Sequence, residues 1–139
     1  MKYLLDVNIL VAWGWNEHTD HERVAKWLAS GRSQSDTEIL TSPIPEIGFV
    51  RVSVQRAAGA IAVREACEAL EGLLFSLGKT HSFIPDDLRG SSLPAWCKGA
   101  ARTTDAYLLA LANSNGAKLA TLDTGIPGAF LVPPTEFPT

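Results

Sequence analysis

The chain has 139 residues, a length that suits one folded domain and leaves little room for two. Hydrophobic residues make up 46% and charged residues 19%, a balance typical of globular proteins that argues against disorder. No apolar run approaches the ~18 residues of a membrane span, and an acid at position 6 interrupts the apolar start, so we expect neither a signal peptide nor a membrane partner. Cys67 and Cys97 lack metal-site spacing and suggest reduced thiols in a cytoplasmic protein.

The net charge of −3, from 12 basic and 15 acidic residues, disfavours a passive nucleic-acid binder when taken alone, since such proteins usually carry a basic excess. If four of the acids gather around a cation, 12 basic residues stand against the 11 acids that remain. Whether the acids are dispersed or clustered is therefore the main question that the charge raises.

Short apolar runs alternate with helical patterns from one end of the chain to the other. In chain order we expect a strand over 2–5, helices over about 8–15 and from 19 or 20 to 30, a strand over 38–41, helices over 44–55 and 60–77, a strand over 81–84, a long loop over 85–101, a helix from 103 or 104 to about 113, and strands over 118–122 and 129–132. The β-branched residues within 44–55 leave a strand open there.

Local signals set the expected ends of these elements. Gly31 is the expected stop of the second helix, and Gly78 ends the helix over 60–77. Thr103 or Thr104 is expected to cap the helix that follows the long loop. Because the strands are continuous apolar runs, the pattern predicts a single α/β domain over 1–139, with a mainly parallel sheet covered on both faces and a proline-rich tail from about 133.

Four acids occupy positions that such a sheet brings to one edge. Ligands of open parallel sheets bind beyond the carboxyl ends of the strands. Asp6 and Asp123 directly follow strand-like runs, and Glu46 stands in the first turn of the helix after the strand over 38–41. Asp105 lies in the first turn of a later helix, and joins the others if its loop delivers the chain to that side.

Each acid also has a structural explanation. Asp6 would cap a helix, Asp105 would be a favourable anion at a helix start, and Asp123 would be a turn residue. Glu46 is hardest to explain in this way because its neighbours are apolar. The alternative function is therefore a non-catalytic α/β protein-interaction module, whose melting temperature would not respond to divalent cations. A flavodoxin-like phosphoacceptor domain ranks lower, since it needs an acidic pair after the first strand.

Taken together, four carboxylates at one edge would repel one another unless a hard cation binds them. Carboxylate oxygens suit Mg²⁺ or Mn²⁺, and the absence of a Cys/His cluster argues against Zn²⁺. Such a site is suited to the attack of water on a phosphodiester, because the metal acidifies the water and offsets charge on the phosphate.

The ordered motifs around these acids resemble those of PIN-domain nucleases. They are Leu-Leu-Asp-Val-Asn-Ile-Leu over 4–10, the lone Glu46, Thr-Asp-Ala-Tyr-Leu-Leu-Ala-Leu-Ala over 104–112, and Leu-Ala-Thr-Leu-Asp over 119–123. Length and element order are similar to those of the VapC-type ribonuclease toxins of prokaryotic toxin–antitoxin pairs. The resemblance spans residues 1 to about 132 and implies a three-layer α/β/α fold.

The resemblance also implies roles for residues and partners. Asp6, Glu46, Asp105 and Asp123 would be the catalytic, metal-binding acids, and Asn8, Thr104 and Thr121 the polar neighbours that orient water or ligands. The implied activity is Mg²⁺-dependent cleavage of RNA by a homodimer, silenced by a cognate antitoxin protein. Many relatives carry a further acid shortly after the fourth one, but Thr-Gly-Ile-Pro follows here over 124–127, which favours one metal ion over two.

Basic residues flank two of the acids and are candidates for contacts with RNA phosphates, although ordinary solvated positions explain them equally well. These residues are Arg51, Arg56, Lys98 and Arg102. His18, His21 and His81 have no triad partner at a recognisable spacing, and we expect them to be surface or capping residues.

Overall fold

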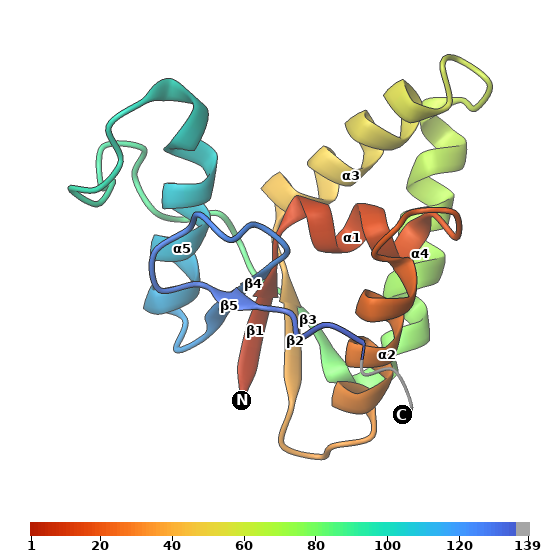
Figure 1. Ribbon diagram of the computed structural model, residues 1–139, viewed down its shortest axis with the longest axis horizontal. Coiled ribbons are helices and arrows are strands. Elements are labelled where there is room, and N and C mark those ends of the chain that lie inside the picture. The colour runs from red at the N-terminus through yellow and green to blue at the C-terminus, as the bar shows by residue number, and fades with distance from the viewer. Residues whose placement is uncertain (136–139) are drawn as a thin grey trace.

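The computed structural model describes residues 1–135, and strands and helices alternate through most of that range (Figure 1). The elements are β1 (Lys2–Leu5), α1 (Val7–Gly14), α2 (His21–Arg32), β2 (Glu38–Thr41), α3 (Pro43–Arg56), α4 (Val63–Leu77), a 3₁₀ turn η1 (Gly78–Thr80), β3 (His81–Phe83), a 3₁₀ turn η2 (Ala100–Arg102), α5 (Thr103–Ser114), β4 (Lys118–Thr121) and β5 (Phe130–Leu131). Within this range no helix is long and apolar enough to cross a membrane.

The five strands form one sheet in the order β3-β2-β1-β4-β5, and every neighbouring pair is parallel. This confirms the expected parallel sheet. β1 lies at its centre, with Leu4 opposite Leu40 of β2 and Leu5 opposite Ala120 of β4. Because all strands run the same way, the residues that follow them come out at one edge of the sheet.

Helices cover both faces of the sheet, which confirms the three-layer α/β/α arrangement (Figure 1). Side chains of successive strand residues point to opposite faces. Leu4 of β1 and Leu119 of β4 pack in the core that includes α5. Leu5, the next residue of β1, packs instead in the core formed with α1, α2, α3 and α4. In Figure 1 the pair α3 and α4 extends beyond the sheet.

Two expected helix signals are wrong. Gly31 does not stop α2, which runs on to Arg32, because glycine costs a helix only about 1 kcal/mol and does not forbid it. Thr103 does not cap α5 with its side chain; its hydroxyl donates to the carbonyl of Ala100 at 2.9 Å, since a 3₁₀ turn runs directly into the helix. Gly78, by contrast, ends α4 as expected, with a φ of 56°.

The remaining differences concern the ends of elements. The segment over 44–55 is helical, so the helix and not the strand is confirmed there. The helix expected over 60–77 begins only at Val63, and the last strand is reduced to Phe130–Leu131. Residues 133–135 of the expected proline-rich tail belong to no helix or strand, and 136–139 lie outside the described residues.

Gly48 lies at a close contact between α1 and α3. A Cβ atom built on it would lie 2.6 Å from Cγ2 of Val7, so an alanine forces the two helices apart. We predict that Gly48→Ala lowers the free energy of unfolding by about 1–3 kcal/mol, as overpacking does. Gly72→Ala in α4 is the control: open space surrounds Gly72, and alanine there is expected to stabilise by up to about 1 kcal/mol. Urea denaturation measures both, and equal effects would contradict the prediction.

Candidate metal centre at the carboxyl edge of the sheet

Asp6 leaves the central strand and begins the first helix. Its backbone N–H donates to the carbonyl of Ala120 at 3.0 Å, which continues the β1–β4 pairing by one residue. Its carboxylate caps α1 by accepting from the N–H of Val7 at 2.7 Å. The residue is only 5% exposed. Asp6 therefore does cap the helix, but it uses only one carboxylate oxygen, Oδ1, to do so.

The other oxygen of Asp6 is held by Thr121, the last residue of β4. The hydroxyl of this fully buried threonine donates to Oδ2 of Asp6 at 2.8 Å and accepts from the N–H of Asp123 at 3.0 Å. Asn8 completes the network: its Nδ2 donates to the Thr121 hydroxyl at 3.2 Å, and its Oδ1 accepts from the N–H of Leu122 at 3.1 Å. Thr121 and Asn8 thus fix the orientation of Asp6 and of the segment that carries Asp123.

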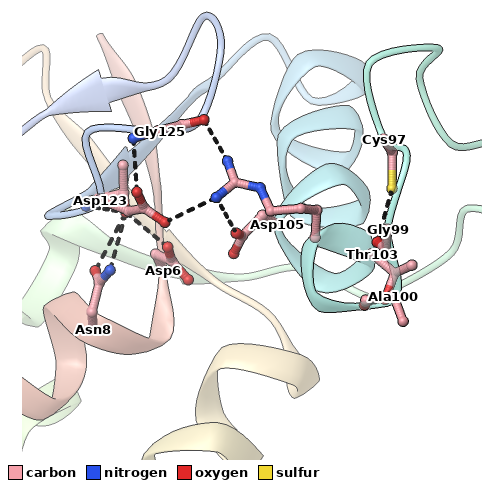
Figure 2. A network of polar contacts seen from close by, with 11 residues as sticks. Asp6, Asn8, Cys97, Gly99, Ala100, Thr103, Asp105, Asp123 and Gly125 are labelled. Atoms are coloured by element: carbon pink, nitrogen blue, oxygen red, sulfur yellow. Dashed lines mark hydrogen bonds and ion pairs between the residues drawn. The ribbon is translucent and has the colours of Figure 1, made fainter.

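Asp123 follows β4 and shapes the turn after it. Its Oδ1 accepts from the N–H of Gly125 at 2.7 Å, as aspartates do in turns. Its Oδ2 lies 3.7 Å from Nη1 of Arg102. The same nitrogen lies 3.9 Å from Oδ2 of Asp105, in the first turn of α5. Figure 2 shows the carboxylates of Asp6, Asp105 and Asp123 gathered around one region.

The three carboxylates influence one another through their charges. Burial raises the pKa of Asp6 above its ordinary value of 3.8, the hydrogen bonds from Thr121 and Val7 lower it, and the charges of Asp105 and Asp123 raise it further. Burial likewise raises the pKa of Asp105, while Arg102 lowers it and Asp123 raises it. Burial, and to a lesser extent the neighbouring carboxylates, therefore make the charged forms of Asp6 and Asp105 less favourable than those of free carboxyl groups.

Glu46 lies at the same sheet edge, in the first turn of α3, but has different partners. The hydroxyl of Thr41 donates to its Oε2 at 2.7 Å, and Nε2 of His81 lies 2.7 Å from that hydroxyl. The Thr41 hydroxyl donates its single hydrogen to Glu46. In its contact with His81 it must therefore accept, and Nε2 of His81 is the donor. Among the hydrogen bonds and ion pairs of residues 1–135, none joins Glu46 to the three aspartates.

His81 is thus more than the surface or capping residue that we expected. It is half-buried, burial lowers its pKa below 6.5, and the charge of Glu46 acts in the opposite direction. The sequence gives no local signal for this contact, because 40 residues separate His81 from Thr41 and only the pairing of β2 with β3 brings them together.

Apart from one arginine, the other predicted site residues have no hydrogen bond or ion pair with the cluster within residues 1–135. Thr104 is exposed, and its side chain makes no hydrogen bond within the described part of the chain. Arg51 and Lys98 are also exposed. Arg56 pairs with Glu17 at 3.5 Å and lies over the ring of Trp15 at 5.1 Å. Arg102 is the exception, since it contacts two of the acids directly.

The donors in this cluster are those that a hard divalent cation prefers. All three side chains offer carboxylate oxygens, and two of them have raised pKa values. In the conformation seen here, no three Asp, Glu, His or Cys side chains within residues 1–135 lie close enough together to ligate one ion. The residue types therefore fit Mg²⁺ or Mn²⁺. In the present arrangement, Arg102 forms ion pairs with two of the three aspartates.

Comparison with known proteins identifies the class to which this fold and site belong. The model of the PIN domain family matches residues 3–129. The chain is 36% identical to Ribonuclease VapC29 of Mycobacterium tuberculosis (strain CDC 1551 / Oshkosh), over 97% of its own length and 99% of the relative. It is 37% identical to Ribonuclease VapC38 of the strain ATCC 25618 / H37Rv, over 88% of its own length and 86% of the relative.

Among solved structures, a chain in the crystal structure of VapBC2 from Rickettsia felis bound to a DNA fragment from their promoter has a similar fold, with a TM-score of 0.60 at 17% identity. The match covers 94% of this chain and 96% of that one. The protein therefore belongs to the PIN-domain family, and within it to the VapC-type members.

Asp105 offers a test of the charge in the cluster. Its raised pKa means that the folded chain binds a proton there more readily than the unfolded chain. The stability that this provides is present below about pH 3.8 and is lost as the pH rises through the higher folded value. Asp105→Asn mimics the protonated form, so we predict that in EDTA it is more stable than the wild type at pH 7, and that this difference shrinks as the pH falls toward 3.8.

Urea denaturation at about pH 4 and about pH 7, near and well above the ordinary pKa of 3.8, measures this difference. Glu68→Gln is the control, because it removes one negative charge at an exposed position of α4 and should change stability by less than about 0.5 kcal/mol. An Asp105→Asn variant that is less stable than the wild type at pH 7 would contradict the prediction.

Proposed function

We propose that this chain is a metal-dependent endoribonuclease, the toxin component of a toxin–antitoxin pair. The observation that carries the proposal is the gathering of Asp6, Asp105 and Asp123 at the carboxyl edge of the sheet. It occurs in a chain whose relatives are named ribonucleases and match it over nearly its whole length. A structural role explains each acid taken singly, but it does not explain why the charges of Asp105 and Asp123 lie close enough to Asp6 to act on it.

In this proposal Asp6, Asp105 and Asp123 hold Mg²⁺, or Mn²⁺ as a substitute. Glu46 is the proposed fourth acid, reached only if it exchanges its hydrogen bond with Thr41. The residues over 124–127 add no further acid, which supports one ion over two. When bound, the ion supplies the acidity that activates water and the positive charge that offsets the charge growing on a phosphate.

The chain's own groups prepare this site. The N–H of Val7 and the hydroxyl of Thr121 hold the two carboxylate oxygens of Asp6 in defined directions, and Asn8 holds Thr121, so little reorganisation is needed there. The unbalanced negative charge would repel an RNA phosphate until a cation is bound. We propose Arg102 at the rim, with Arg51, Arg56 and Lys98 farther away, as the groups that contact the RNA backbone.

We further propose a cognate antitoxin protein as partner, a homodimer as the state in solution, and the cytoplasm as the location. Kinship with VapC ribonucleases supports the antitoxin. The surface also exposes large apolar side chains on α3, α4 and β3, an indication of contact with other proteins. They are Ile47 at 65%, Val63 at 59%, Phe75 at 87% and Phe83 at 57% exposure.

Cleavage of purified cellular RNA tests the activity. We predict that the wild type cleaves RNA in Mg²⁺ and not in EDTA, and that Asp6→Asn and Asp105→Asn each reduce the rate at least about a hundredfold. Glu46→Gln should reduce it less, because Glu46 is bonded to Thr41 and not to the cluster. Asp87→Asn removes the same charge from an exposed loop position and serves as the control. Equal cleavage by wild type and Asp105→Asn would refute the assignment.

A further inference from the structure

Arg102 lies beside two of the three acids of the cluster. Its Nη1 lies 3.7 Å from Oδ2 of Asp123 and 3.9 Å from Oδ2 of Asp105, and its Nη2 donates to the carbonyl of Gly125. Figure 2 shows these contacts between the start of α5 and the turn after β4. The positive charge of the guanidinium offsets part of the carboxylate charge.

The ring of Trp96 and the turn at Gly125 position the guanidinium of Arg102. Its carbon lies 5.8 Å from the ring centroid of Trp96, within the range of a cation–π contact. Gly125 leaves room for it: a Cβ atom there would lie 3.3 Å from Nη1 and 3.4 Å from Nη2 of Arg102. The turn that orients Asp123 through the N–H of Gly125 is therefore the same turn that anchors the arginine.

The ion pairs themselves are weak enough to be exchanged. Both distances exceed the ~2.7–2.9 Å of a strong charge-assisted hydrogen bond, and the arginine side chain is 35% exposed. Partly solvated pairs of this kind add little stability. The contacts with Gly125 and Trp96 do not involve the acids and can persist when the ion pairs are broken.

We propose that Arg102 is a built-in counter-ion of the cluster that competes with the divalent cation, so that metal binding requires its guanidinium to leave Asp105 and Asp123. The inference rests on the metal site of the proposed function. Two positive groups cannot share these oxygens without strong repulsion. In the absence of metal Arg102 therefore protects the fold from carboxylate repulsion, and in its presence the arginine is released at the rim, close to where a phosphate would approach.

Calorimetric titration of the full metal-free chain with Mn²⁺ tests this proposal. Arg102→Gln should bind Mn²⁺ about three- to tenfold more tightly than the wild type, the change that one or two exposed ion pairs correspond to. Arg102→Lys should fall between them, because lysine keeps the charge but lacks the planar fork. Arg64→Gln, which removes an exposed arginine from α4, should change the affinity less than about twofold.

Thermal melting gives a second measurement, in which Arg102→Gln should be less stable than the wild type without metal but gain more stability from it. In EDTA Arg102→Gln should melt below the wild type, and saturating Mn²⁺ should raise its melting temperature by more than it raises that of the wild type. If the wild type binds Mn²⁺ and Arg102→Gln binds it no more tightly, Arg102 does not compete and the inference is overturned while the metal site stands. If neither binds Mn²⁺, the metal site and the competition are both refuted.

Discussion

The hydrogen bond from the Thr121 hydroxyl to Asp6 joins the ends of two neighbouring parallel strands, and the geometry of the site depends on it. β1 and β4 are paired so that Asp6 and Thr121 emerge at the same level of the sheet. Because the threonine is fully buried, its hydroxyl cannot turn to water and must be satisfied by these partners. Asp123, two residues later, is placed by the same hydroxyl.

Two of the three aspartates form hydrogen bonds that support the local fold, but gathering the charges of all three is electrostatically unfavourable. Asp6 caps a helix and Asp123 closes a turn, so each acid contributes to the local fold. Burial nevertheless raises the pKa of Asp6, and the charges of Asp105 and Asp123 raise it further. A fold selected for stability alone would not gather three carboxylates in this way; proteins accept such costs at functional sites. Arg102 reduces the cost without removing it, and leaves the carboxylate oxygens available to a stronger cation.

Simple rules predicted those parts of the structure that depend on short-range signals. Continuous apolar strands predicted the parallel sheet, and the rule that ligands gather at strand ends brought Asp6 and Asp123 together. Glu46 follows its strand to the same edge, and its hydrogen-bond partner there is Thr41, the buried last residue of β2. Thr41 holds Glu46 much as Thr121 holds Asp6, so a threonine at a strand end was a usable signal in both places.

Other features depend on contacts between distant segments. Arg102 is predicted from the sequence to contact RNA phosphates. Its spacing of three residues from Asp105 on a helix also permits an ion pair with that residue. The contact with Asp123 arises only when the chain folds. His81 reaches Thr41 only through the pairing of β3 with β2. The start of α5 agrees with the expected position, but the expected threonine cap is wrong because a 3₁₀ turn precedes the helix and accepts the Thr103 hydroxyl hydrogen.

The most direct test of the central claim is a crystal structure of the chain grown with Mn²⁺, in which anomalous scattering locates the ion. We predict one ion about 2 Å from carboxylate oxygens of Asp6, Asp105 and Asp123, with the guanidinium of Arg102 turned away from both of its present acidic partners. An ion bound elsewhere on the chain, or three aspartates that stay as they are in crystals saturated with Mn²⁺, would contradict the claim.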